Sequence, residues 1–327
     1  MTVLVTGSSG HLGEALMRTL QAQRREAIGI DILPGEFTQH IGSIADLAFV
    51  RRCMKGVTTV LHAATLHKPH VATHSRQDFV DVNISGTLNL LEEAAAAGVT
   101  AFVYTSTTSV FGDALVPPPG EPAAWITEDV TAVPKNIYGV TKAAAEDLCQ
   151  LFARNHSLRA IVLRTSRFFP EEDDNRAVRE VYTDANIKTN EFLYRRVDIE
   201  DVVSAHLQAA LHAPSAGFAK YIISATTPFA QQDAAELRSN APLVVRRYVP
   251  DYEAEFARRR WTMIPGIDRV YVNDRARAEL GWQPRHDFRA LIARLRTGED
   301  IRSPLAREIG SKGYHDRVFG EGPYPVE

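Results

Sequence analysis

Short apolar runs rich in β-branched residues alternate with longer amphipathic segments along the first two thirds of the chain. The short runs predict strands, and the longer segments, in which apolar residues recur every three or four positions, predict helices. In chain order, the predicted elements cover residues 3–6, 12–23, 27–30, 47–54, 58–61, 79–97, 101–105, 138–154, 160–163, 199–212 and 221–224. Strands joined by helices at this spacing predict an α/β fold with a doubly wound parallel sheet.

The alternation weakens over residues 164–196 and again from about residue 227, where arginine clusters and prolines occur. Because open α/β sheets bind ligands at the carboxyl ends of their strands, we expect both segments to form a smaller lobe over that edge. The expected division is a nucleotide-binding domain (residues 1–166 and 196–226) and a substrate lobe with a C-terminal tail (residues 167–195 and 227–327). We expect the irregular tail to pack over the lobe or a neighbouring subunit through Tyr314, Phe319 and Tyr324.

The composition limits the possible partners. Of 327 residues, 45% are hydrophobic and 24% are charged, with a formal net charge of -3. This charge provides no basic surface for nucleic acid or anionic membranes, so a small-molecule substrate fits better. Cys53 and Cys149 are far apart in the sequence, which favours a reducing compartment over a disulfide framework. Since the chain shows no basic leader and no run of about 18 apolar residues, we expect a soluble cytoplasmic protein.

A glycine motif follows the first predicted strand. Residues 6–13 read TGSSGHLG, and glycines at such a turn permit a tight bend, close approach of a pyrophosphate, and packing of the helix on the strand. We expect this Rossmann-type turn to bind a dinucleotide through Gly7, Gly10, His11, Leu12 and Gly13. The alternative is a glycine turn without a ligand.

Asp31 ends the second predicted strand, where a carboxylate can accept both adenosine ribose hydroxyls and repel a 2′-phosphate. Ile32 follows at a position where an NADP enzyme would often place arginine. The predicted cofactor is therefore NAD. The alternative interpretation makes Asp31 a solvated turn residue.

A second constellation lies farther along the chain. Tyr138 and Lys142 are four residues apart on a predicted helix, so an ammonium can lie near the phenol and lower its pKa of about 10 toward working pH. The strand before this helix ends in a run of hydroxyls that includes Ser106, Thr107 and Thr108. A hydroxyl there could bind the reacting oxygen. Taken alone, Tyr138 and Lys142 could equally be an exposed helix pair.

Together these motifs resemble the extended short-chain dehydrogenase/reductases, often called the NAD-dependent epimerase/dehydratase family. The resemblance covers roughly residues 1–290, through segments 6–13, 62–64, 82–87, 106–112, 138–142, 198–201 and 280–284. It implies that Tyr138 is the acid/base, that Lys142 lowers its pKa and binds nicotinamide ribose, and that Thr107 is the hydroxyl partner of Tyr138. It also implies that Ser106 flanks the site. Further residues assigned to the cofactor are His62, Ala63, Ala64 and Asn83.

The family's dimers imply a homodimer through the helices around residues 83–98 and 138–154, which carry the small residues 94–97 and 143–145. Ordinary packing of these helices on the sheet is the alternative.

Residues 62–74 contain four of the 11 histidines. A metal site would need three convergent ligands, whereas His67, His70 and His74 are spread across a proline that disrupts a helix. We therefore predict no metal and interpret the segment as a cofactor and substrate loop. His67 is a candidate substrate contact.

Family dehydratases and decarboxylases commonly place acidic residues after the catalytic hydroxyl, but Thr107 is followed by Thr108 and Ser109. This favours an epimerase or a simple dehydrogenase over a dehydratase. We expect a sugar or nucleotide-sugar epimerase, with a dehydrogenase of a free sugar, sugar acid or other small alcohol as the alternative. A non-catalytic NAD-binding protein is a third interpretation, which the intact Tyr138 and Lys142 disfavour.

The predicted lobe complicates the choice of substrate. Nucleotide-sugar enzymes usually carry Gly-Pro after the fifth strand and an Arg-Asp pair farther on, where this chain has FFPEEDD at residues 168–174 and Tyr194-Arg195. Arg167 and Phe168 are expected to contact the substrate, and the acidic run 171–174 is interpreted as a solvated turn. Six arginines could bind an anion: Arg176, Arg179, Arg195, Arg196, Arg246 and Arg247. A compact sugar acid or lactone is therefore a rival to a nucleotide sugar.

Overall fold

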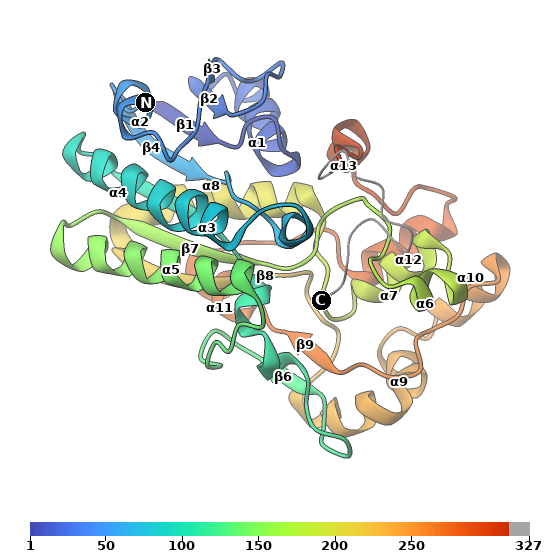
Figure 1. Ribbon diagram of the computed structural model, residues 1–327. Helices are drawn as coiled ribbons and strands as arrows, with labels where there is room; N and C mark the ends of the chain where they lie inside the picture. The colour runs from blue at the N-terminus through green and yellow to red at the C-terminus, as the bar shows by residue number, and fades with distance from the viewer. Residues whose placement is uncertain (314–327) are drawn as a thin grey trace.

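Seven parallel strands form the central sheet, in the order β3-β2-β1-β4-β5-β7-β8 (Figure 1). They are β1 (Thr2–Thr6), β2 (Ala27–Asp31), β3 (His40–Ile41), β4 (Val57–His62), β5 (Ala101–Thr107), β7 (Ala160–Thr165) and β8 (Phe218–Ile223). The predicted α/β fold is confirmed. This computed structural model describes residues 1–313, so Tyr314, Phe319 and Tyr324, the predicted anchors of the tail, lie outside the described residues.

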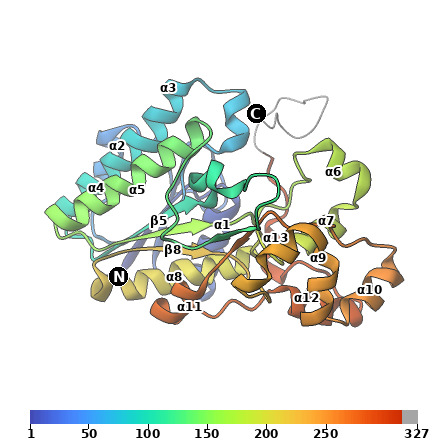
Figure 2. The ribbon, with the colours of Figure 1, turned by 90° about the horizontal axis from the view of Figure 1, so that it is seen from below.

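Helices cover both faces of the sheet, as Figure 2 shows. One face carries α1 (His11–Ala22) and α8 (Ile199–Ala216), and the other carries α2 (Leu47–Cys53), α4 (Gly86–Ala96) and α5 (Ile137–Asn155). Side chains on the two faces of β1 therefore enter two separate cores: Val3 and Val5 pack toward α1 and α8, and Leu4 packs toward α2 and α4. Burial on both faces explains why the strands are continuous apolar runs.

The helix predicted over residues 79–97 is interrupted in the structure. The short α3 (Arg76–Phe79) leads into a π-helical segment, Val80–Ser85, before α4 begins. A π-helical turn shifts the register of the side chains and is frequent at functional sites. Here it brings Asn83 to a buried position beneath the loop that follows β4.

The lobe contains more regular structure than the sequence predicts. It includes α6 (Arg176–Val181), α7 (Asp184–Glu191), α9 (Ala234–Tyr248), α10 (Tyr252–Arg259) and α12 (Phe288–Arg296). Two later helices lie instead on the sheet domain: α11 (Asp274–Leu280) against β8 and α8, and α13 (Pro304–Ile309) against α1 and α8. The lobe has its own apolar core, in which Leu237, Val244 and Leu291 are fully buried.

A two-stranded parallel sheet joins the lobe to the segment that follows β5. In it β6 (Ala124–Ile126) pairs with β9 (Arg269–Tyr271). Residues 124–126 thus contribute to the lobe side of the molecule, although the sequence-based division places them in the nucleotide-binding domain. Within residues 1–313, no helix is long and apolar enough to cross a membrane.

Candidate active site

The glycine turn between β1 and α1 is closed by direct backbone contacts. Gly7 has a φ of +74°, and a Cβ there would lie 2.9 Å from the Ala64 nitrogen. A Cβ on Gly13 would lie 1.8 Å from the Gly7 carbonyl oxygen. Both positions therefore require glycine. The amino end of α1 then opens into the cleft with no side-chain cap at Gly10, which leaves backbone N–H groups for an anion.

Asp31 is held at the rim of the same cleft. Its carboxylate accepts the N–H of Ser9 at 2.9 Å and the N–H of Leu33 at 2.9 Å. These bonds fix the carboxylate next to the glycine turn, where it can accept ribose hydroxyls. Ile32 beside it is 64% exposed and also lines the cleft.

A cleft of about 970 Å³ runs from this turn along the carboxyl edge of the sheet to the lobe. The structure brings most of the predicted site residues together along it: Gly7, Gly10, His11, Leu12, Gly13, Asp31, Ile32, Ala63, Ala64, His67, Ser106, Thr107, Thr108, Tyr138, Lys142, Arg167 and Phe168. These residues thus line one continuous cleft, which has room for the reactive end of a dinucleotide and for a small substrate beside it.

His62 and Asn83 do not line the cleft, and their predicted contacts with the cofactor stay a prediction. The His62 ring is buried between two hydroxyls, with Nδ1 2.8 Å from Thr6 Oγ1 and Nε2 3.0 Å from Thr87 Oγ1. Thr6 Oγ1 accepts the N–H groups of Ala63 and Ala64 and can therefore donate only to the imidazole. Burial holds the pKa of His62 well below its usual 6.5, so the ring is neutral and positions the loop.

Asn83 fixes the next part of that loop. Its Oδ1 accepts the N–H of Leu66 at 2.8 Å, and its Nδ2 donates to the Leu66 carbonyl and to Thr141 on α5. All these contacts are buried. Asn83 therefore holds the loop that carries His67 against the helix that carries Tyr138.

Tyr138 lies in the first turn of α5, which Asn136 caps by accepting the Gly139 N–H at 3.0 Å. Burial raises the pKa of the Tyr138 phenol to about 12, and a hydrogen bond with the Thr107 side chain acts in the opposite direction. Thr107 Oγ1 accepts the Ser109 N–H at 3.1 Å, which leaves its O–H available to donate. The pair can therefore bind a reacting oxygen.

Lys142 is buried one helical turn farther along α5. Its Nζ donates to the Thr105 carbonyl at 2.6 Å and lies 4.2 Å from the centre of the Tyr104 ring. Burial lowers the pKa of Lys142 to about 7, and the charge of Glu146 opposes this shift. The ammonium is thus held by a carbonyl and a ring. The predicted lowering of the Tyr138 pKa by Lys142 stays a prediction, because the interactions in the structure place that pKa above its usual value.

Glu146 is a buried residue of this site that the sequence reasoning missed. Its carboxylate accepts the Ser106 hydroxyl at 2.6 Å and pairs with Arg164 on β7 at 2.8 Å and Lys220 on β8 at 3.1 Å. The sequence feature that could have identified Glu146 is its position four residues after Lys142, which places both side chains on one face of the helix. The Ser106 hydroxyl, predicted to bind substrate, instead links the end of β5 to α5.

The loop between β7 and α8 carries a network of ion pairs. Glu191 pairs with Arg195 at 2.6 Å, Arg196 at 2.7 Å and Arg167 at 3.5 Å. Asp173 adds a second carboxylate, 2.9 Å from Arg167. These arginines are therefore already neutralised in part, which the sequence could not show.

The predicted solvated acidic turn at residues 171–174 is wrong for three of its four members. Asp173 is 5% exposed, Asp174 pairs with Lys68 at 3.2 Å, and Glu171 lies 2.9 Å from His11 Nε2. Only Glu172 is exposed. The run folds inward because cations from the sheet domain and the lobe face it.

The other predicted anion-binding arginines also have protein partners. Arg176 pairs with Glu180 and Arg246 with Glu253, and both pairs are exposed. Arg247 pairs with Asp233 and Glu236. The Arg179 guanidinium donates to the Asp173 carbonyl. None of these four lines the cleft.

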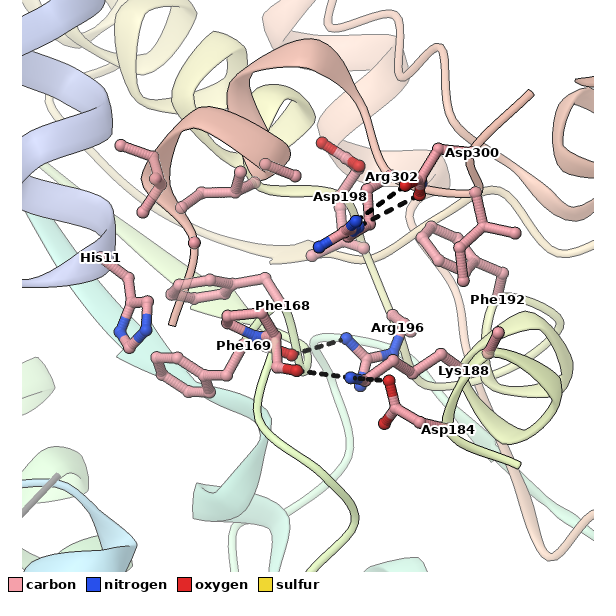
Figure 3. Close-up of a pocket in the computed structure, with 18 of the residues that line it drawn as sticks. His11, Phe168, Phe169, Asp184, Lys188, Phe192, Arg196, Asp198, Asp300 and Arg302 are labelled. Carbon is pink, nitrogen blue, oxygen red and sulfur yellow. Dashed lines mark hydrogen bonds and ion pairs between the residues drawn. The ribbon is translucent and has the colours of Figure 1, made fainter. Parts of the chain in front are cut away.

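A second cavity of about 430 Å³ lies beside the cleft, and Phe168 and Phe169 line both. Figure 3 shows these two rings between His11 and Arg196. The cations drawn in it are engaged: Lys188 lies 2.6 Å from Asp184, and Arg302 lies 2.7 Å from Asp300. The candidate catalytic and cofactor-binding residues, such as Asp31, Tyr138 and Lys142, line the larger cleft and not this cavity.

Three histidines of the segment 62–74 line the cleft: His67, His70 and His74. His67 begins a 3₁₀ helix, Lys68–Ala72, and its ring centre lies 6.4 Å from that of Tyr138 and 5.5 Å from that of Phe169. Burial lowers the pKa of His67 well below 6.5. In the part of the chain that the structure describes, no group of three or more His, Cys, Asp or Glu residues could hold a metal ion.

Comparison with known proteins agrees with this architecture. Residues 3–223 match the model of the NAD dependent epimerase/dehydratase family. The UDP-glucose 4-epimerase of Azospirillum brasilense is 25% identical over 345 residues, which cover 95% of this chain and 94% of that protein. The UDP-glucose 4-epimerase of Streptomyces lividans is 28% identical over 55% of this chain, which spans only 55% of that relative.

Solved structures share the fold. A short-chain dehydrogenase/reductase superfamily protein from Agrobacterium tumefaciens, solved with bound NAD, has a TM-score of 0.65 at 24% identity, over 94% of this chain and 99% of that one. At this identity the likeness concerns the fold, so the roles of individual side chains depend on their geometry in this chain.

Proposed function

Because the chain belongs to the NAD-dependent epimerase/dehydratase family, we propose that it is a sugar or nucleotide-sugar epimerase that uses Tyr138 as its acid/base. One observation carries the proposal: Tyr138, Thr107 and Lys142 line the same cleft as the glycine turn and Asp31. A substrate bound between the lobe and β5 would thus meet a proton donor and a dinucleotide together.

The residues of the sheet edge fit NAD. The glycine turn admits a pyrophosphate because Gly7 and Gly13 leave no side chain between backbone and ligand. Asp31 would accept the adenosine ribose hydroxyls and disfavour a 2′-phosphate. Bound NAD would supply the acceptor and donor of hydride.

Proton transfer is the task of Tyr138. With a pKa of about 12, its phenol is protonated at neutral pH and suited to donate a proton to a carbonyl oxygen. A cation near the phenol would lower this pKa and allow the reverse transfer from a substrate hydroxyl. We therefore expect base function in the cofactor-loaded enzyme. Thr107 would hold the reacting oxygen beside the phenol.

A dehydrogenase of a free sugar or sugar acid is the second candidate. Glu172 lines the cleft and is exposed, and its carboxylate would repel a diphosphate. In this version the oxidised sugar leaves and the cofactor exchanges.

A denaturation experiment tests the proposal and separates the two candidates. Freshly purified protein would be denatured and the released nucleotide identified by mass spectrometry, and intact protein would be incubated with UDP-glucose without added NAD. Stoichiometric NAD and a product sugar inverted at one carbon support the epimerase. Empty protein that forms NADH from added NAD and a free sugar or sugar acid supports the dehydrogenase. If no sugar is converted under either condition, the enzymatic proposal fails.

We also propose that the enzyme is a cytoplasmic homodimer that pairs through α4 and α5. These helices lie side by side on one face of the sheet in Figures 1 and 2, and Val140 on α5 is 47% exposed. Val140→Glu should then shift the sedimentation coefficient from dimer to monomer. An unchanged coefficient would reject this interface.

A further inference from the structure

The cations that line the cleft differ in whether they have a carboxylate partner. Lys68 pairs with Asp174, Lys135 with Asp113, and Arg167 with Asp173. Arg195 pairs with Glu191, and Lys312 also contacts a carboxylate, that of Glu14. Within residues 1–313, Lys142 and Arg269 are the cations of the cleft that have no such partner.

Arg269 also makes no hydrogen bond with its guanidinium among the described residues, and its Nε is buried without an acceptor. Arg195 has the same deficiency at Nε, although its Nη2 contacts Glu191. A buried guanidinium N–H without an acceptor costs free energy. The two Nε atoms are enclosed by the protein, so a ligand in the cleft would meet the other N–H groups of each guanidinium, and those of Arg269 have no acceptor within residues 1–313.

The backbone brings these two arginines to the same end of the cleft. Arg269 begins β9, and two residues later the Tyr271 N–H donates to the Tyr194 carbonyl at 3.0 Å. Tyr194 directly precedes Arg195. The pairing of β9 with β6 in turn fixes the Arg269 backbone opposite Ala124.

We propose that Arg195 and Arg269 form an anion-binding subsite at the lobe end of the cleft, where they take a carboxylate or phosphoryl group of the substrate. A planar guanidinium offers parallel N–H donors that match the oxygens of either group. Glu191 and Asp173 neutralise Arg195 in part, which leaves Arg269 as the main source of uncompensated charge. This inference rests on the proposed function in one respect: it assumes that the substrate binds in the cleft.

Binding can be measured without turnover, so the test is independent of the redox proposal. Full-length protein loaded with NADH, which cannot accept a hydride from a sugar, would be titrated calorimetrically with D-glucuronate, D-glucose 1-phosphate and D-glucose. We expect at least one of the anionic sugars to bind at least about tenfold more tightly than glucose, as a charge-assisted hydrogen bond would produce. Preference for glucuronate identifies a carboxylate, and preference for glucose 1-phosphate identifies a phosphoryl group.

Arg269→Gln should weaken binding of the preferred anion by about 10- to 100-fold and leave glucose binding unchanged. Arg277→Gln is the matched control, because it removes the charge of an exposed arginine that pairs with Asp274 outside the cleft. Arg269→Lys retains the charge and guards against misfolding. It should keep part of the preference, and thermal unfolding would verify both variants.

Three results would overturn the subsite: wild-type protein that binds none of the anions more tightly than glucose, a folded Arg269→Gln variant that keeps the preference, or an equal loss in Arg277→Gln. A protein that converts UDP-glucose equally well with Arg269→Gln would uphold the epimerase and reject the subsite. Anion binding that depends on Arg269, in a protein that converts no sugar, would uphold the subsite and reject the epimerase.

Discussion

The cleft buries cations at two of its edges and compensates them differently. At the sheet edge, the Lys142 ammonium contacts a neutral carbonyl and an aromatic ring. At the lobe edge, Arg167, Arg195 and Arg196 share the carboxylate of Glu191. Lys142, Arg196 and Glu191 are all buried, so the difference between the two edges lies in the partners of their cations.

The partners decide what each edge can do. Without a direct carboxylate, burial lowers the pKa of Lys142 to about 7, and burial raises that of Tyr138 to about 12, so both groups favour their neutral forms. At the lobe edge burial acts on Glu191 too, but Arg195 and Arg196 outweigh it and lower the pKa of this carboxyl far below its usual range. The sheet edge is therefore suited to proton transfer, and the lobe edge to fixed charge.

Tyr138→Phe should have the largest effect, because it removes the proton donor while keeping the ring. We expect kcat to fall by about 10²- to 10⁴-fold, the usual contribution of a general acid/base. NAD affinity, measured by calorimetry, should change little. Tyr194→Phe is the control, since this partly buried phenol packs against the core of the lobe. If wild type and Tyr138→Phe have comparable turnover, Tyr138 is not the proton donor and the sheet edge is not the site of proton transfer.

Glu191→Gln should affect stability more than chemistry. It leaves the buried Arg196 and the half-buried Arg167 and Arg195 without their shared carboxylate, and loss of one partner of a buried ion pair costs about 3–5 kcal/mol of unfolding free energy. Glu180→Gln breaks the exposed pair with Arg176 and should cost less than about 1 kcal/mol. Urea denaturation at neutral pH measures both. Equal costs would show that the lobe network is not a stabilising one.

The pH dependence of stability should come from the sheet edge. Between the Lys142 pKa of about 7 in the folded protein and 10.5 in the unfolded chain, the unfolded chain holds a proton that the folded protein has lost. Stability should therefore rise with pH in this window, by up to about 1.4 kcal/mol per pH unit from this group. The cost of burying the charged ammonium is fully present below pH 7 and is relieved above it.

Replacing Lys142 with Met should remove that slope. Lys188 also has a pKa lowered by burial, so the informative quantity is the wild-type slope minus the variant slope. Lys55→Met, at an exposed position, should leave the slope unchanged. Unfolding free energies at several pH values between 7 and 9 measure these slopes. If wild type and Lys142→Met have parallel curves, the ammonium is not as strongly desolvated as the structure indicates.

The same comparison explains what the sequence could predict. The sheet edge is built from local patterns: periodic strands, glycines at fixed spacing, and Tyr138 and Lys142 on one helix face. The lobe edge depends on contacts between distant segments, such as Lys68 with Asp174 and Tyr194 with Tyr271, which no local pattern encodes. Arg269 was missed for this reason, as was the support that His62 and Asn83 give to the loop that follows β4.

Ser106→Ala should have the smallest effect. The residue lies at the sheet edge and lines the cleft, yet its hydroxyl donates to Glu146 at 2.6 Å. Glu146 keeps its contacts with Arg164 and Lys220 in the variant, so we expect a loss of only about 1 kcal/mol in unfolding free energy. The Michaelis constant should stay within about threefold of wild type, because a loss of about 0.6 kcal/mol or less is expected when no substrate contact is removed.

Thr108→Ala provides the contrast at the neighbouring position, where no hydrogen bond of the hydroxyl to the described protein is recorded. A rise in the Michaelis constant for Thr108→Ala with little change for Ser106→Ala would assign substrate contact to Thr108 and support of the strand to Ser106. The opposite result would support the predicted contact between Ser106 and the substrate. It would also show that the Ser106 hydroxyl at the sheet edge can leave Glu146 to contact a ligand, whereas Arg196 at the lobe edge is buried together with its carboxylate partner Glu191.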